Sequence, residues 1–203
     1  VPCVVGTGTA CEILKDYDYV TVSCSEGETG YVYDGKLKYN INRVNLESLE
    51  RPKTQIMMNV GNPDNAFALS FIPNDGVGLA REEFIISNYI QVHPLALARI
   101  DTLTDENVIN KIREITRAYA DKKQFFIDKL ARGIAKIGAA FYPKDVIVRL
   151  SDFKTNEYAN LIGGRQFEPE EHNPMLGFRG ASRYYDPEYK DAFAMECAAI
   201  LKA

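Results

Sequence analysis

Two arginines stand where short apolar segments end, and this position limits the chemistry that the sequence can support. Arg149 interrupts the apolar run 145–150, and Arg81 closes the glycine-rich run 75–81. A guanidinium buried in an apolar strand is costly unless it meets an anion. Its planar fork can hold a phosphate or a carboxylate through parallel hydrogen bonds. The pattern therefore indicates a site for a small anion.

Each of these arginines also has a purely structural interpretation. Arg149 could form an ion pair with nearby Asp152. Arg81 could be an exposed side chain that pairs with Glu82 and Glu83. Either residue alone leaves both interpretations open. The same arrangement at the ends of two predicted strands favours the functional one.

A third arginine follows in a loop. Residues 173–179 read Asn-Pro-Met-Leu-Gly-Phe-Arg and deliver Arg179, and Arg183 follows at helical spacing. The alternative for both residues is a solvated face. We include Arg179 in the candidate anion site and leave Arg183 outside it.

Other polar residues are interpreted as structural. Asn59 stands at the end of a predicted strand and is expected to cap the turn that follows. Residues 6–9, Gly-Thr-Gly-Thr, lack the further glycine or lysine of a phosphate-binding loop and predict a turn. We expect His93 to pack in an apolar region. The acidic loop 168–172, which contains His172, is expected to be solvated.

Cysteine usage and charge limit the class of protein. The cysteines lack CxxC spacing and lie far from both histidines, so we expect free thiols, no zinc site and a reducing, cytoplasmic compartment; they are Cys3, Cys11, Cys24 and Cys197. The formal net charge is −4, and no basic stripe is present, which argues against nucleic-acid binding. No apolar run is long enough to span a membrane.

The chain divides into two unequal parts. Residues 1–42 are rich in Gly, Val, Thr and Tyr and predict strands at 19–23 and 30–33, joined by a turn at 26–30. A polar linker is predicted at 43–53. The first part is too short to be a stable domain alone. We therefore interpret it as the tail of a β-rich unit.

The second part, residues 54–203, predicts strands alternating with helices. Strands are expected at 55–60, 75–81 and 145–150. The last of them is apolar on both faces, as a parallel sheet covered by helices requires. Three strand–helix units amount to about half of a (β/α)₈ barrel by count. In such barrels the C-terminal ends of the strands carry the active site, which is where both strand arginines stand.

Four helical segments are expected in this part. One covers 82–89, a second has Thr104 as its cap, a third ends before Pro143, and the last begins at a cap, Asp186, followed by Pro187. The predicted apolar stripes are Val108, Ile109, Ile112, Ile115 and Tyr119; Phe125, Phe126, Leu130, Ile134, Ile137 and Phe141; and Tyr189, Phe193, Cys197 and Ile200. The fold class is therefore α/β, a partial barrel that looks truncated at both ends.

Three segments, in order, resemble the arginine motifs of the phosphoenolpyruvate (PEP)-utilising enzymes. They are 76–84, 148–152 and 173–179. Within that family, the PEP synthases are the most similar at residues 149–158, 57–63 and 182–184. Residues 1–35 resemble the end of the swivelling phosphohistidine domain of these enzymes.

The resemblance implies a phosphotransferase with paired acceptors. ATP phosphorylates a histidine on the swivelling domain, with release of AMP and phosphate, and pyruvate then accepts the phosphoryl group to give PEP. Arg81 and Arg149 match the arginines that bind the phosphoryl and carboxylate groups, and Arg179 belongs to the third motif. Mg²⁺ is required, and the intact enzyme is expected to be a homodimer.

The resemblance also implies what this chain lacks. The phosphohistidine is expected shortly before Val1. The Mg²⁺ ligands and a proton-donating cysteine are expected beyond Ala203, and ATP is expected on a separate domain. No catalytic or metal-binding residue is therefore assigned within the chain, and we expect the chain alone not to turn over.

Three alternatives stay open. Pyruvate phosphate dikinase would form pyrophosphate in place of free phosphate. Enzyme I of the sugar phosphotransferase system would pass the phosphoryl group to a carrier protein. A non-catalytic module that senses PEP would use the same arginines for binding alone.

Overall fold

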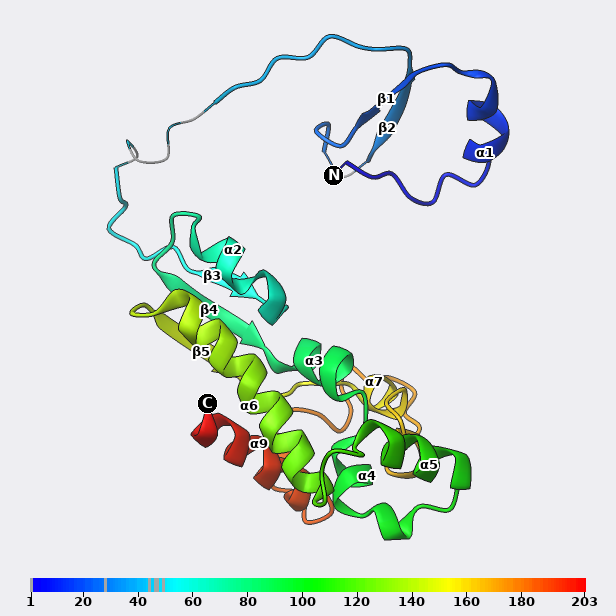
Figure 1. The fold of residues 1–203 in the computed structure, drawn as a ribbon, viewed down its shortest axis with the longest axis vertical. Helices are drawn as coiled ribbons and strands as arrows, with labels where there is room; N and C mark the ends of the chain where they lie inside the picture. The colour runs from blue at the N-terminus through cyan, green and yellow to red at the C-terminus, as the bar shows by residue number, and fades with distance from the viewer. Residues whose placement is uncertain (1, 28, 44, 46–47, 49) are drawn as a thin grey trace. The chain divides into compact units, whose positions relative to one another are not determined.

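The computed structural model describes residues 2–27, 29–43, 45, 48 and 50–203, which form two compact units, Val1–Glu50 and Arg51–Ala203 (Figure 1). Part of the predicted linker 43–53 and Glu28 of the predicted turn lie outside the described residues. Each unit is described by itself. The predicted domain limits at 42 and 53 remain predictions.

The first unit is a hairpin with a short helical segment. A helix α1 (Ala10–Ile13) and a 3₁₀ turn η1 (Leu14–Asp16) precede the strands β1 (Val20–Ser23) and β2 (Tyr31–Asp34). The strands pair antiparallel, so both predicted strands are confirmed. None of the residues described between 2 and 50 is fully buried. This unit therefore has no core of its own within the described chain.

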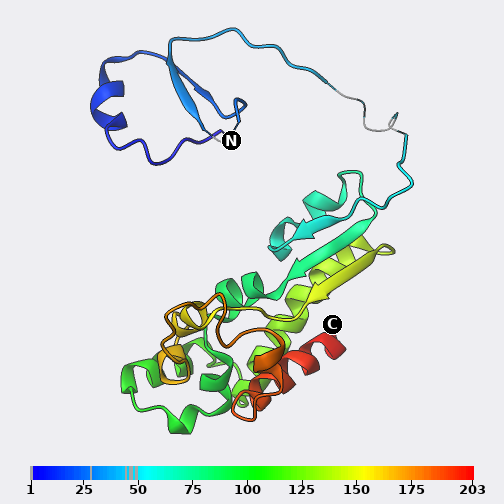
Figure 2. The same cartoon turned by 180° about the vertical axis from the view of Figure 1, so that it is seen from behind.

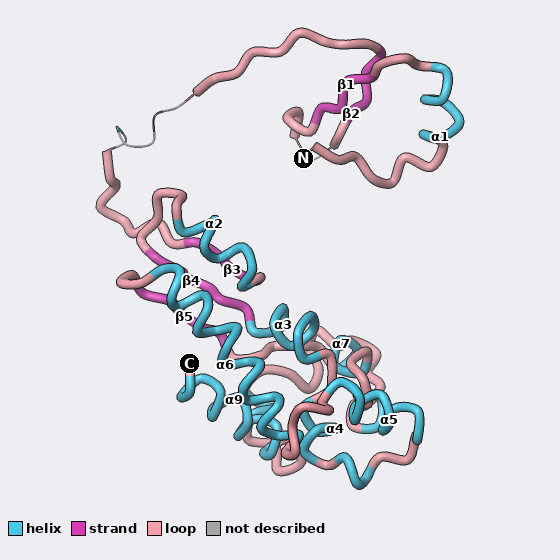
Figure 3. The backbone as a smooth tube through the Cα atoms, viewed as in Figure 1, coloured by secondary structure: helices cyan, strands magenta, loops and turns pink. Residues whose placement is uncertain are grey.

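The second unit is built on a parallel sheet. Its strands are β3 (Met58–Val60), β4 (Gly76–Arg81) and β5 (Asp145–Arg149), in that spatial order. All three predicted strands are present, although β3 is shorter than the predicted 55–60. Parallel neighbours need crossover connections, and helices supply them here (Figure 3). The mixed α/β class is confirmed.

The helices of this unit range from three-residue 3₁₀ turns to an α-helix of 20 residues. In chain order they are η3 (Pro63–Asn65), α2 (Ala66–Ser70), α3 (Glu82–Ile85), the π-helix η4 (Ile86–Ile90), α4 (Pro94–Ala98), η5 (Ile100–Thr102), α5 (Glu106–Ile115), α6 (Lys122–Phe141), α7 (Thr155–Ala159), η6 (Gly164–Gln166), α8 (Ala181–Tyr184) and α9 (Lys190–Lys202).

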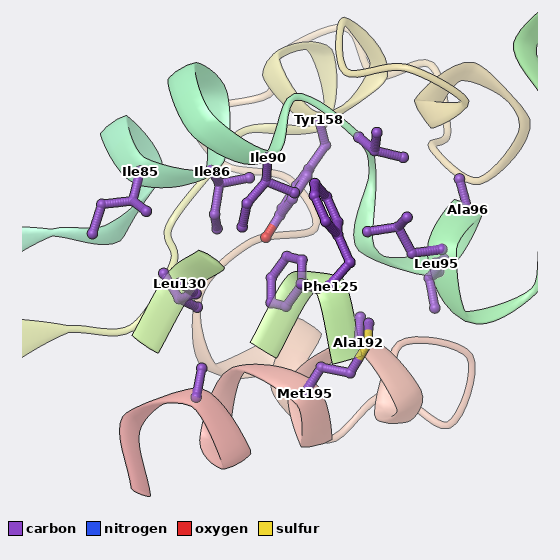
Figure 4. Packing of buried hydrophobic residues seen from close by; sticks show 14 of the residues in the cluster. Ile85, Ile86, Ile90, Leu95, Ala96, Phe125, Leu130, Tyr158, Ala192 and Met195 are labelled. Atoms are coloured by element: carbon purple, nitrogen blue, oxygen red, sulfur yellow. The ribbon is translucent and has the colours of Figure 1, made fainter. Parts of the chain in front are cut away.

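Helix α6 is the centre of the core. Its predicted stripe is confirmed, because all six apolar side chains are buried: Phe125, Phe126, Leu130, Ile134, Ile137 and Phe141. The C-terminal part of the stripe packs with residues of β3 and β4, and the N-terminal part packs with α3, α4 and α9. Figure 4 shows this second cluster, in which Tyr158 lies among the isoleucines of α3 and η4.

The prediction that β5 is covered on both faces was wrong. Val146 and Val148 pack against the clusters that contain α6, but the side chain between them, Ile147, is 55% exposed. Successive residues of a strand point to opposite faces. Figure 2 shows β4 and β5 from the side away from α6, where none of the described helices covers them. The described sheet is thus packed on one face only.

Two predicted helix starts were displaced. Asp105, not Thr104, caps α5, because its carboxylate accepts hydrogen bonds from the N–H groups of Asn107 and Val108. Asp186 does not begin α9. Its backbone carbonyl accepts from Tyr189 N–H, which closes a separate turn, and α9 begins after that turn.

The predicted stripe of α9 was also incomplete. Tyr189 is buried, and Phe193 and Ile200 pack at the edge of the core. The fully buried positions inside the helix are instead Ala192, Met195, Glu196 and Ala199. A glutamate therefore occupies a core position of this helix.

Candidate functional site

All three predicted arginines line one cleft at the C-terminal edge of the sheet. Arg81 and Arg149 come from the ends of β4 and β5, and Arg179 comes from the loop before α8. The cleft has a volume of about 280 Å³ and is also lined by Glu83, Phe84, Asp152, Phe153, Lys154 and Glu157. Its charged lining holds four cationic and three anionic side chains. A small anion is the ligand that this charge pattern favours.

Strand register brings the first two arginines together. Arg81 and Arg149 are direct partners in the parallel ladder of β4 and β5, and the preceding pair is Ala80 and Val148. Val148 packs toward the helices. Because side chains alternate between faces, both arginines lie on the face of the sheet away from α6.

Arg81 is free for a ligand. It is exposed, and it makes no hydrogen bond or ion pair with any residue that the structure describes. The alternative pairing with Glu82 and Glu83 is therefore not formed. Glu82 is buried in the core, and Glu83 turns to Arg149.

Arg149 is partly engaged. One terminal nitrogen donates a hydrogen bond to Oε1 of Glu83. Asp152 Oδ2 lies 3.8 Å from the other terminal nitrogen, so the predicted pairing with Asp152 exists but is the longer contact. The side chain is 41% exposed, and its Nε is buried without a partner among the described residues. Because the side chain lines the cleft and is partly exposed, its terminal nitrogens keep donor capacity toward a ligand.

Arg179 is held in place by Asp152. Its Nε donates to Oδ1 at 3.0 Å, and one terminal nitrogen donates to Oδ2 at 2.8 Å and to the Asp152 carbonyl at 3.2 Å. The hydrogen bonds from Arg179 hold the pKa of Asp152 below its usual range. This bidentate pair orients the guanidinium beside the other two arginines.

Glu83 is a cleft residue that the sequence interpretation treated only as a partner for Arg81. Its Oε1 accepts from Arg149 and also from the backbone N–H of Asp152 at 2.8 Å. One carboxylate at the start of α3 therefore links the end of β5 to the loop that carries Asp152. No local sequence signal separates this glutamate from its neighbour Glu82.

Hydrogen bonds from the loop after β5 to helix α9 hold this loop in place. Ser151 is buried and donates to Glu196 through both its backbone N–H (2.8 Å) and its hydroxyl (2.5 Å). Burial is the largest cause of the raised pKa of the Glu196 carboxyl. Glu82 lies near Glu196, and burial together with that neighbour raises its pKa to about 10. Apart from Glu196, the buried oxygens of Glu82 have no partner in the described part of the chain.

Arg183 is a core residue, contrary to its interpretation as part of a solvated face. It is fully buried and forms a bidentate pair with Glu168, with both contacts at 2.6 Å. Its guanidinium lies over the rings of Tyr158, Phe178 and Tyr189. Arg183 is not among the residues that line the cleft.

The same pair corrects the interpretation of the loop 168–172. The Glu168 side chain is fully buried and also accepts from Nε2 of His93 at 2.9 Å, whose Nδ1 accepts from Leu95 N–H. His93 is therefore a packed residue, as predicted. Burial lowers its pKa. His172 is exposed, as predicted.

Asn59 does not cap the turn after β3. It is exposed, and Asn62 takes that role because its Oδ1 accepts from Asp64 N–H at 2.9 Å. Residues 6–9 do form a turn, with Thr9 N–H donating to Thr7 O. The four cysteines are free thiols.

Comparison with known proteins identifies the family. The profile of the family described as PEP-utilising enzyme, PEP-binding domain, matches residues 38–203. The chain belongs to the PEP-utilising enzymes. The matched region contains all three arginines and the whole cleft.

Several curated members of this family are similar to the chain over nearly its whole length. The phosphoenolpyruvate synthase of Synechocystis is 58% identical over 98% of the chain, and that of Escherichia coli is 52% identical over 98%. The phosphoenolpyruvate synthase of Aquifex aeolicus is 51% identical over 100% of the chain. The chain spans 25% to 29% of the length of these relatives.

The cleft carboxylates do not fit a magnesium site. Magnesium prefers several free carboxylate or water oxygens in an octahedral arrangement. Glu83 and Asp152 instead hold Arg149 and Arg179, and Glu157 pairs with Lys154. Among the described residues there is no cluster of three or more His, Cys, Asp or Glu side chains that could hold a metal ion. In the same part of the chain, no helix is long and apolar enough to cross a membrane.

Proposed function

We propose that the cleft binds PEP and pyruvate through Arg81, Arg149 and Arg179, as a segment of a PEP synthase. The observation that carries this proposal is the in-register pair Arg81 and Arg149, of which Arg81 has no partner among the described residues. The membership of the PEP-utilising family and the names of the similar proteins support the same ligand.

The three arginines would differ in how much of each guanidinium is available to the ligand. Arg81 offers its whole guanidinium to the phosphoryl or carboxylate group. Arg149 shares its charge between Glu83 and the ligand. Arg179 is held by Asp152 and contributes a fixed positive charge. Preorganised charges of this kind stabilise negative charge that develops on an enolate or on a transferring phosphoryl group.

The reaction of the whole enzyme is part of the proposal. ATP and water leave a phosphorylated histidine and release AMP and phosphate, the oxygen of the pyruvate enolate accepts the phosphoryl group from the histidine, and PEP is formed. We propose that the histidine, the ATP site and the Mg²⁺ ligands belong to the three quarters of the relatives that this chain does not span. Magnesium would neutralise phosphoryl charge when bound, and this chain would supply the arginines. We further propose a homodimeric, cytoplasmic enzyme.

The fold supports a finer proposal. We propose that residues 54–203 are the first part of a (β/α)₈ barrel and that 1–42 are the tail of a swivelling phosphohistidine domain. Three parallel strands lie in chain order, as in such a barrel. The exposed Ile147 would then face the barrel interior, which further strands would fill.

Calorimetric titration of the chain with PEP tests the binding proposal. Arg81→Ala should weaken binding by about tenfold or more, because a charge-assisted hydrogen-bond pair is lost. Arg113→Ala is the matched control, since Arg113 is exposed on α5, outside the cleft lining. Equal affinities for the Arg81→Ala variant and the control would reject the assignment of Arg81.

A further inference from the structure

The segment from Arg149 to Asp152 carries the carboxylate that binds Arg179. Asp152 holds Arg179 through both carboxylate oxygens, so any movement of Asp152 moves that guanidinium. Between Arg149 and Asp152 lie Leu150 and Ser151, which have left the strand. The fixed point of this loop is Ser151, which is 1% exposed.

Every polar group of Ser151 has a partner. Glu196 accepts from its N–H and its hydroxyl, on two different carboxylate oxygens. The carbonyl of Ser151 accepts from the Tyr184 hydroxyl at 2.8 Å. The loop is thereby tied to α9 and to α8 at a single residue.

A chain of hydroxyl groups sets the direction of these bonds. The Tyr189 hydroxyl donates to that of Tyr158 at 2.6 Å, and the Tyr158 hydroxyl lies 2.9 Å from Ser151 Oγ. Because the single proton of the Ser151 hydroxyl is donated to Glu196, the Ser151 oxygen accepts a hydrogen bond from the Tyr158 hydroxyl. Tyr158 sits within the core cluster that Figure 4 shows, so the chain runs through a packed interior.

Stability alone does not account for a carboxylate at position 196. Glu196 is 1% exposed and forms no ion pair within the described chain, and a second buried carboxyl, Glu82, lies near it. A buried carboxyl without a cation is costly, and an apolar residue of similar volume is usually as stable or more so. Both oxygens of the Glu196 carboxyl accept hydrogen bonds from Ser151, and the Glu82 carboxyl lies against the same group.

We infer that Glu196 is a positioning residue for the anion cleft. It fixes Ser151, Ser151 fixes the backbone of Asp152, and Asp152 orients Arg179. Glu83 secures the same segment from the other side, through the N–H of Asp152. This inference rests on the proposed function, because the orientation of Arg179 matters only if the cleft binds an anion.

Variants of the 203-residue chain separate positioning from packing. Glu196→Gln keeps an acceptor for the Ser151 N–H and can donate to its hydroxyl, whereas Glu196→Leu removes both bonds at similar volume. Met195→Ala is the matched control, because it opens the core on the same helix without touching Ser151. Ser151→Ala removes the hydroxyl contacts with Glu196 and Tyr158, keeps the N–H bond to Glu196, and serves as a second variant if Glu196→Leu does not fold.

Two readouts are needed: the dissociation constant for PEP, and the NMR signals of the Ser151 N–H and the Arg179 Nε–H. Glu196→Leu should weaken PEP binding by about tenfold, in the range typical of lost supporting contacts around a site. It should also shift the Ser151 signal and broaden that of Arg179. Ser151→Ala should weaken binding by about threefold, less than Glu196→Leu, because the N–H of residue 151 still donates to Glu196. Glu196→Gln should restore affinity to within about twofold, and Met195→Ala should lower the melting temperature without these changes.

The outcomes distinguish the two proposals. If the unmodified chain binds PEP and Glu196→Leu and Ser151→Ala bind it equally well, the positioning role is overturned and the proposed function stands. If the unmodified chain does not bind PEP, the proposed binding fails. The Arg179 signal then decides the positioning role, because a sharp and unshifted signal in Glu196→Leu would overturn it.

Discussion

Arg81 and Arg149 are direct partners across two parallel strands, although they carry the same charge. Like charges at facing positions of a sheet are destabilising unless neighbours compensate. Glu83 compensates on Arg149, and Asp152 lies close to it as well. Arg81 keeps its charge uncompensated among the described residues, and this imbalance makes the cleft attractive to an anion.

Removing Glu83 should destabilise the chain. Glu83→Ala leaves the Asp152 N–H without an acceptor and Arg149 without its nearest carboxylate. We expect a loss of about 2 kcal/mol in the free energy of unfolding, measured by urea denaturation. Glu114→Ala, an exposed change on α5, should cost much less. Equal losses for the two variants would contradict this role of Glu83.

Breaking the buried pair at Arg183 should be more severe. Arg183→Ala leaves the buried carboxylate of Glu168 with His93 as its remaining partner among the described residues. The expected loss of stability is about 3 to 5 kcal/mol. Lysine should rescue little of it, because it cannot form the bidentate pair or stack over the three rings. Thermal unfolding of both variants, beside Arg117→Ala on the surface, measures the difference. A lysine variant as stable as the parent chain would be the contrary result.

Stability should decline as the pH rises from 7 to 9. The folded-state pKa of Glu82 is raised to about 10, so the folded chain keeps a proton that the unfolded chain has already lost. The stabilisation is complete below the unfolded pKa of 4.5 and decreases steadily up to the folded value. The slope for one proton is about 1.4 kcal/mol per pH unit.

Glu82→Gln should remove most of this slope. Burial lowers the pKa of His93, so this histidine is neutral at both pH values. Burial raises the pKa of the Cys197 thiol, but both chains carry Cys197 and its contribution cancels in the comparison. Urea unfolding at pH 7 and pH 9 provides the measurement. Parallel pH dependence in the parent and in Glu82→Gln would argue against a protonated Glu82.

The chain alone should not complete the reaction. With ATP, pyruvate and Mg²⁺ supplied, we expect no pyruvate-dependent formation of AMP and phosphate above a blank, because the phosphohistidine and the ATP site are proposed to lie in the parts of the relatives that it does not span. A coupled AMP assay on the purified chain tests this. Turnover that depends on both pyruvate and ATP would refute the expectation.

The sequence located the arginines of the cleft because their signal is local. A charged residue that ends an apolar run marks the end of a strand, and parallel pairing then brings Arg81 and Arg149 together. The long stripe of α6 was predictable for the same reason, since its period repeats over five turns. Whether the arginines bind a substrate remains a prediction.

The acidic residues could not be found in this way. Glu82 and Glu196 occupy helical positions whose neighbours in sequence look like those of exposed glutamates. Their burial is decided by the packing of α3 and α9 on α6, which joins segments distant in the chain. The pair Glu168 and Arg183 was missed for a related reason. Glu168 stands in an acidic segment whose composition is typical of a solvated loop, although its side chain is buried against Arg183. The exposure of Ile147 depends on which elements cover that face of the sheet, and the composition of the strand does not predict those elements.

The separation of β4 and β5 along the chain has a kinetic consequence. Residues 82–144 lie between the two strands, so their pairing closes a long loop and is expected to be slow. Helix α6 directly precedes β5 and packs beside both strands, which suits it to guide the late strand into register. The two arginines meet only when this step is complete. Recovery of anion affinity during refolding would therefore report when β4 and β5 pair.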